Sequence, residues 1–207
     1  DKGWFWYIPL SGGMVSVGIV AERDYLFNGS TKDHAEIFQR EVQNNEWIKE
    51  HLADGEQTGE YRITGEYSYR NKFCSMDGLV LAGDALGFLD PVFSSGVFLA
   101  LKSGVMLADE IDQVIQSGEQ IRSTSFENYG KRMQSSIETM RKIVYAFYDK
   151  DFSFGDLVKR GDHLRSALTD CLVGNVDDQD FRELFDAMSD LAALPEPVEH
   201  GLAHASS

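Results

Sequence analysis

The most closely spaced chemistry-bearing residues of this chain lie between residues 78 and 104, in the run GLVLAGDALGFLDPVFSSGVFLALKSG. Asp84 follows one short apolar run, and Ser94, Ser95 and Gly96 precede another. A carboxylate at a strand end accepts hydrogen bonds from ligand hydroxyls, and free backbone N–H groups at a helix start hold an anion. The loop between them has few bulky polar side chains, so a large ligand can approach it closely. The spacing predicts a ligand site between a strand end and a helix N-terminus.

A strand and a helix must position these groups. Residues 79–82 are apolar and are bounded by Gly78 and Gly83, which is typical of a strand covered on both faces. Pro91 removes a backbone donor and stiffens the turn, and a helix is expected to start around Ser94. The apolar stripe predicted for this helix comprises Val97, Leu101, Val105, Ala108, Ile111 and Ile115.

The run from Gly83 to Val97 resembles the second flavin-contacting motif of FAD-dependent oxidoreductases of the aromatic hydroxylase type, and it is most similar to flavin-dependent halogenases and geranylgeranyl reductase-like proteins. The resemblance implies that Asp84 bonds a ribityl hydroxyl of FAD and that residues 91–97 lie along the isoalloxazine ring. A helix N-terminus carries roughly half a positive charge, which suits a reduced flavin. The pair Gly83-Asp84 by itself would also be consistent with an ordinary strand-turn-helix that binds no cofactor. The predicted cofactor-binding residues are Gly83, Asp84, Pro91, Ser95, Gly96 and Val97, and the predicted halide-binding residues are Ser95 and Gly96.

A second motif begins the chain, where Trp4, Trp6, Ile8 and Pro9 match the W-x-W-x-I-P signature of flavin-dependent halogenases. On a strand, the two tryptophans and Ile8 share one face. A turn at residues 11–13 and a returning strand over residues 14–20 predict a hairpin. The resemblance implies that these four residues line the substrate pocket, although an aromatic-rich strand is also typical of a protein core.

The resemblance extends over about residues 1–192, but no glycines have the G-x-G-x-x-G spacing of a pyrophosphate loop. The family's catalytic lysine lies outside this chain, so the catalytic residues stay unknown. We expect the chain to be the C-terminal part of a longer protein. The resemblance implies an enzyme that halogenates an electron-rich small molecule with reduced FAD, oxygen and halide. A separate flavin reductase would supply the reduced FAD. The alternatives are an FAD-dependent monooxygenase or geranylgeranyl reductase-like oxidoreductase, and a non-catalytic binding module derived from a flavoprotein.

Composition excludes several other functions. The 207 residues have a formal net charge of -15, and nucleic-acid binding needs clustered lysine and arginine. No apolar run approaches the roughly 20 residues that span a bilayer. Cys74 and Cys171 are too few for a disulfide framework and are expected as free thiols in the cytoplasm. His200 and His204 stand four apart without a further ligand, so no metal site is predicted.

The remaining pattern predicts an α/β (α+β) fold with a mixed sheet, a hairpin and a helical C-terminal section. The resemblance implies that this is the C-terminal part of an FAD-dependent aromatic hydroxylase-like fold. The expected domains are residues 1–118, which contact flavin and substrate, a helical section over 119–194, and a flexible tail over 195–207. A helix capped by Thr31 is expected to run to about Leu52, and a strand is expected over residues 61–69. A long helix starting near Ser123 would pack against the sheet or, alternatively, form a coiled coil.

Overall fold

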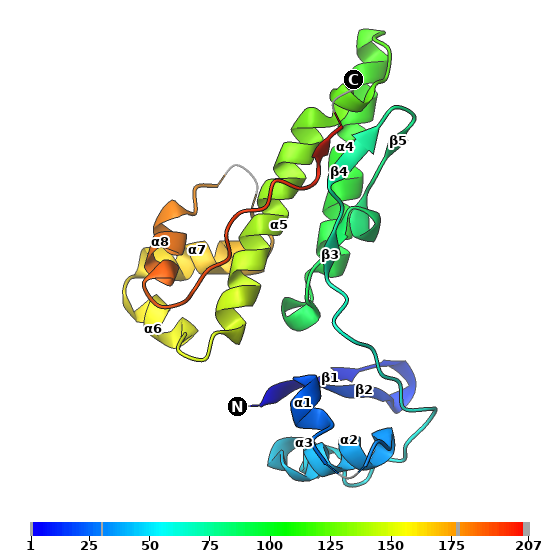
Figure 1. The fold of residues 1–207 in the computed structure, drawn as a ribbon, viewed down its shortest axis with the longest axis vertical. Helices are drawn as coiled ribbons and strands as arrows, with labels where there is room; N and C mark the ends of the chain where they lie inside the picture. Colours follow the sequence, from blue (N-terminus) through cyan, green and yellow to red (C-terminus); the bar gives the residue numbers. More distant parts are fainter. Residues whose placement is uncertain (1, 30, 177–178, 205–207) are drawn as a thin grey trace. The chain divides into compact units, whose positions relative to one another are not determined.

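The computed structural model describes residues 2–29, 31–176 and 179–204, and it divides into two compact units between Gly65 and Glu66. Each unit combines helices with small sheets or strand pairs, as Figure 1 shows. The predicted mixture of α and β structure is therefore confirmed. The expected boundaries at residues 118 and 194 differ from this division and stay predictions. None of the helices within the described ranges has the length and apolar character needed to cross a bilayer.

The first unit is a hairpin with three helices. Strand β1 (Gly3–Pro9) pairs antiparallel with β2 (Val15–Ala21) across the turn η1 (Ser11–Gly13), which confirms the predicted hairpin. The helices are α1 (Arg23–Leu26), α2 (His34–Gln43) and α3 (Glu46–Leu52).

The single helix predicted up to Leu52 is wrong, because Asn45 starts a new helix in the middle of it. The Asn45 side chain accepts a hydrogen bond from the Ile48 N–H at 3.1 Å, which caps α3. At the start of α2 the cap is Asp33 rather than Thr31, since its carboxylate accepts from the N–H groups of residues 35 and 36.

The second unit is built around two long helices, α4 (Gly96–Ser117) and α5 (Glu127–Tyr148), which lie side by side (Figure 1). Strands β5 (Leu79–Val80), β4 (Phe73–Met76) and β7 (Leu202–Ala203) form one sheet, in which β7 is parallel to β4. Strand β3 (Tyr69–Arg70) pairs with β6 (Gly87–Phe88). Short 3-10 turns are η2 (Gly83–Ala85), η3 (Pro91–Phe93) and η4 (Ser123–Phe126), and the last helices are α6 (Phe154–Lys159), α7 (Asp162–Leu172) and α8 (Arg182–Ser189).

Helix α5 contributes to two apolar cores, which excludes the coiled-coil alternative. Its first half packs with the small sheet and α4, and its second half packs with α6, α7 and α8. The first core comprises Cys74, Leu86, Met106, Phe126, Tyr129, Met133 and Ile137. The second comprises Ile143, Ala146, Leu157, Leu164, Leu168, Cys171, Val176, Phe181, Leu184, Met188 and Ala192.

Three expectations for this unit are wrong. The strand expected over 61–69 is only the pair Tyr69–Arg70, and the run at 79–82 is an edge hairpin strand whose Leu79 is 52% exposed. Most of the apolar stripe predicted for α4 is turned outward, since Val97 is 74% and Leu101 is 68% exposed, whereas Ile111 packs against the first core. The buried side of α4 instead carries Leu99, Ser103 and Met106.

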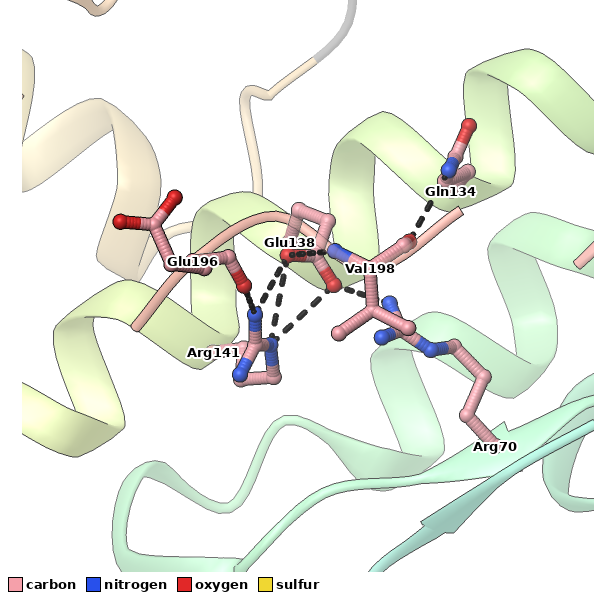
Figure 2. A network of polar contacts seen from close by, with 6 residues as sticks. All are labelled: Arg70, Gln134, Glu138, Arg141, Glu196 and Val198. Atoms are coloured by element: carbon pink, nitrogen blue, oxygen red, sulfur yellow. Dashed lines mark hydrogen bonds and ion pairs between the residues drawn. The ribbon is translucent and has the colours of Figure 1, made fainter. Parts of the chain in front are cut away.

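The C-terminal segment, expected to be a flexible tail, is bound along α5 up to residue 204. Figure 2 shows Glu138 accepting hydrogen bonds from Arg141 and from the Val198 N–H, while Gln134 donates to the Val198 carbonyl at 3.0 Å. The Arg141 guanidinium also donates to the carbonyl of Glu196. These bonds satisfy backbone groups that would otherwise face water, so the segment has a defined path into β7. Residues 205–207 of the predicted tail lie outside the described residues.

Candidate functional site

The turn η2 presents the Asp84 carboxylate to solvent. Gly83 has a φ of +55°, a left-handed conformation that favours glycine. A Cβ at Gly83 would lie 3.2 Å from the Cβ of Ala100 on α4, so the turn packs tightly on this helix. Asp84 itself is exposed. Its carboxylate is therefore held on a closely packed turn and is accessible to a ligand.

The start of α4 has free backbone N–H groups. Asp90 accepts a hydrogen bond from the Val92 N–H at 3.0 Å, which fixes the preceding turn η3. Ser94 follows with a φ of 53°, an unusual conformation for a residue other than glycine. Ser95 is buried at the N-cap, but its side chain makes no capping hydrogen bond. The first N–H groups of the helix also have no intrahelical carbonyl to bind, so they can serve an anion.

A side chain at Gly96 would project toward the protein rather than into open space. A Cβ there would lie 3.2 Å from the ring of Phe88. A side chain at this position would be in tight contact with Phe88 of β6, so glycine favours close packing here. Its N–H group still belongs to the free first turn of the helix.

A cavity of about 120 Å³ adjoins Ser95. Its walls come from residues 93–95 and Phe98 on one side, and from Met140 and residues 171–174 on the other. Residues 171–174, at the end of α7, thus border the start of α4. Burial raises the pKa of the Cys171 thiol to about 12, with the nearby Asp170 charge adding to the rise, so this wall residue stays protonated.

Gly174 and Phe98 both line this cavity and lie against each other. Gly174 has a φ of +81°, and a Cβ on it would lie 2.2 Å from the Phe98 ring. Lys102 donates a hydrogen bond to the Gly174 carbonyl at 3.4 Å, and its ammonium lies 5.4 Å from the centre of the Phe98 ring. The phenyl ring is therefore fixed between a helix and a tight turn.

In the first unit, the two faces of β1 differ in their packing. Phe5 contacts Phe38 of α2, and Tyr7 contacts Trp47 and His51 of α3. The opposite face carries Trp4 and Trp6, whose rings meet edge to face with centroids 6.4 Å apart.

The tryptophan face is only half-buried. The indole of Trp6 donates to Ser16 at 3.2 Å and lies over Gly18, where a Cβ would be 1.9 Å from the ring. On the same strand, Ile8 is 50% exposed and Pro9 is also exposed. The helices α2 and α3 therefore cover the Phe5 face, and the four residues predicted for the substrate pocket are not core residues.

The structure brings the predicted cofactor residues together around α4. Gly83 and Asp84 pack on this helix, and residues 91–97 lead into its first turn. Four residues of this region were not predicted: Ser103 and Tyr129, which hydrogen-bond to the backbone beside the turn, and Phe98 and Gly174, which line the cavity. The one available signal was Ser103, a polar residue in helical register with Leu99 and Met106.

These residues fit FAD. Asp84 is an exposed acceptor suited to the ribityl hydroxyls, Gly83 allows the turn to lie close on α4, and the first turn of α4 offers N–H donors. No group of three histidine, cysteine, aspartate or glutamate side chains within the described ranges is placed to bind a metal ion.

The family model described as tryptophan halogenase matches residues 1–169. The chain is 29% identical over 201 residues to a 1H-pyrrole-2-carbonyl-(peptidyl-carrier protein) chlorinase of Pseudomonas fluorescens, a match that covers 97% of this chain and 44% of the relative. The solved flavin-dependent brominase Bmp2 is 25% identical with a TM-score of 0.78, covering 91% of this chain and 47% of its own. A flavoprotein/dehydrogenase from Cytophaga hutchinsonii is 29% identical with a TM-score of 0.75, covering 92% and 47%. The chain thus spans less than half the length of these proteins.

Proposed function

The chain belongs to the tryptophan halogenase family of flavin-dependent halogenases, and on this premise we propose that the protein halogenates an electron-rich small molecule with FAD, oxygen and halide. One observation carries the proposal. The turn that presents Asp84 packs on the same helix, α4, whose N-terminus borders the cavity at Ser95. Cofactor, halide and substrate positions therefore fall along one helix.

The cofactor would be held by its central and ring portions. FAD, when bound, supplies the oxidising chemistry that this chain's own side chains lack. Asp84 would accept a hydrogen bond from a ribityl hydroxyl, with Gly83 keeping the turn close to α4. The N–H groups of Gly96 and Val97 would face the negatively charged edge of the reduced ring, as the positive end of a helix dipole favours. Pro91 would fix the approach of the loop.

The halide would bind at Ser95 and Gly96, where a helix start offers unpaired N–H donors. Ser95 is buried and borders the cavity. A halide here would lie next to a substrate in the cavity.

The cavity favours a single aromatic ring as the reacting part of the substrate. Its volume of about 120 Å³ can be compared with an apolar cavity of roughly 150 Å³ that binds benzene in another protein. The walls are mainly aromatic or aliphatic side chains, with Ser94 and Ser95 as polar groups. The chlorinase relative acts on a pyrrole carried by a peptidyl-carrier protein, so we infer a single electron-rich ring, free or carrier-bound. Within the first unit, Trp4, Trp6, Ile8 and Pro9 stay the residues predicted to contact substrate.

A separate flavin reductase would supply reduced FAD. We propose a cytoplasmic location because Cys74 and Cys171 are free, buried thiols. The first expected alternative, an FAD-dependent monooxygenase or reductase, would act without halide. The second alternative, a non-catalytic module, would show no turnover.

Titration of FAD into the apoprotein tests the site. In the protein of full natural length, Asp84→Ala should weaken FAD binding by about 1.5–3 kcal/mol, the usual contribution of a charge-assisted hydrogen bond. Asp109→Ala, which removes an exposed carboxylate from the middle of α4, is the matched control and should leave the affinity unchanged. Equal FAD affinity for wild type and Asp84→Ala would refute the assignment.

A further inference from the structure

The backbone on both sides of Asp84 is held by side chains from three other elements. Tyr129 of α5 donates its hydroxyl hydrogen to the Leu81 carbonyl at 2.7 Å. The Ser103 hydroxyl of α4 accepts from the Gly83 N–H at 2.7 Å and donates to the Ala100 carbonyl at 2.8 Å. Both bracing side chains are fully buried. The approach to the turn is thus fixed by a fully satisfied hydrogen-bond network.

Tyr69 of β3 and Asn71, which directly follows this strand, hold the other end of the turn. The Asn71 amide group donates to the Ala85 carbonyl at 2.6 Å, and its backbone N–H donates to Leu86 at 2.9 Å. The Tyr69 hydroxyl donates to the carbonyl of Asp84. The carbonyl groups of residues 84–86 are therefore bound from outside the turn, while the Asp84 side chain is exposed.

Strand β3 is itself fixed to α5. Between Tyr69 and Asn71, Arg70 forms an ion pair with Glu138, as Figure 2 shows. Their side chains are 10% and 12% exposed, so water screens this pair weakly. Arg70 therefore connects the residues that hold the turn to α5, the helix whose Met140 lines the cavity.

We propose that Ser103 and Asn71 are positioning residues for the cofactor: they hold the backbone of residues 83–85 so that the Asp84 carboxylate stands where the ribityl hydroxyl binds. This inference rests on the proposed function. A carboxylate on an unbraced surface turn would lose conformational entropy when it binds a ligand. A turn that is already fixed does not, and its affinity for the ligand is higher for that reason.

Ser103→Ala removes the brace, and Ser136→Ala is its matched control. Both serines are fully buried on long helices, but within the described residues the Ser136 hydroxyl has no hydrogen-bond partner. In FAD titrations of the full-length apoprotein, Ser103→Ala should raise the Kd about tenfold, and Ser136→Ala should change it less than twofold. Thermal unfolding of each apoprotein verifies folding. If Ser103→Ala does not fold, the exposed Asn71→Ala variant provides the same test, with an expected rise of about fivefold.

A double-mutant cycle separates positioning from a general loss of structure. If Ser103 acts through Asp84, Ser103→Ala should raise the Kd less than twofold in the Asp84→Ala background. The same rise in both backgrounds would overturn the proposal, because it would mean that Ser103 affects FAD binding independently of Asp84. An unchanged Kd in Ser103→Ala and Asn71→Ala, alongside a weakened Asp84→Ala, would also overturn it while leaving the proposed cofactor site intact. An unchanged Kd in Asp84→Ala would overturn both.

Discussion

Glu138 connects β3, α5 and the C-terminal segment, so its loss should have a large and pH-dependent effect. Its carboxylate accepts from Arg70, from Arg141 at 2.8 Å and from the Val198 N–H at 3.4 Å. Burial alone would raise the pKa of Glu138, but the hydrogen bonds and charges of Arg141 and Arg70 outweigh it and hold the pKa below its usual range. The ionised form is therefore stabilised by folding.

Glu138→Gln keeps an acceptor oxygen but removes the charge between two guanidinium groups. Each charge-assisted hydrogen bond contributes roughly 1.5–3 kcal/mol, and breaking one partner of a buried pair costs about 3–5 kcal/mol. Because glutamine retains part of the bonding, we expect a loss of about 2–4 kcal/mol in the free energy of unfolding at pH 7. Urea denaturation of wild type and variant measures this difference.

The pH dependence gives the stricter test. A carboxyl whose pKa is lowered by folding stabilises the protein fully above the pKa of the unfolded chain, about 4.3 for glutamate, and this stabilisation is lost as the pH falls through the folded-state value. The difference between wild type and Glu138→Gln should be constant from pH 7 to about 5.5 and shrink below about 4.5. Glu127→Gln is the control on the same helix, since its carboxylate is 55% exposed and lies 3.9 Å from Lys131; about 0.5 kcal/mol or less is expected. An equal difference for Glu138→Gln at pH 7 and pH 4 would refute the reasoning.

Two further substitutions test the cavity and the hairpin. Gly174→Ala should lower the free energy of unfolding by about 1–3 kcal/mol and push the Phe98 ring into the cavity, because its Cβ would overlap that ring. Gly118→Ala is the control, since Gly118 also has a positive φ but open space around it. Equal melting temperatures for the two variants would contradict the overlap. Trp4→Phe or Trp6→Phe should cost about 1–3 kcal/mol and alter the product distribution measured by mass spectrometry. Lower thermal stability with unchanged products would remove both tryptophans from the substrate pocket.

Local patterns in the sequence were sufficient for the hairpin and for the extent of the long helices. The aromatic run around Trp4 and Trp6 and the glycine turn at residues 11–13 indicate β1 and β2 from local sequence alone. The helix expected from Ser94 onward is α4, but the face predicted to be buried is exposed at Val97 and Leu101. Periodicity identifies an apolar face, whereas the element that covers it is chosen by tertiary packing. In this chain α4 packs through Leu99 instead.

The candidate site could be proposed from the sequence where its residues form one contiguous motif, since Asp84 and Ser95 lie in the same run of residues. The contacts that distant residues make with this motif could not be predicted. Tyr129 and Ser103 reach the same turn from positions 48 and 20 residues away from their partners, and no local pattern reports such a contact. The C-terminal segment was expected to be flexible from its composition, yet Gln134 and Glu138 bind the backbone of Val198, which composition does not reveal.

Halide-dependent product formation tests the central claim most directly. The protein of full natural length would be incubated with a flavin reductase, NADH, FAD, oxygen and a single-ring substrate such as a phenol or a pyrrole, with and without bromide. Mass spectrometry should detect a brominated product only when bromide is present. A hydroxylated product whose amount does not depend on bromide would contradict the account and identify an FAD-dependent monooxygenase instead.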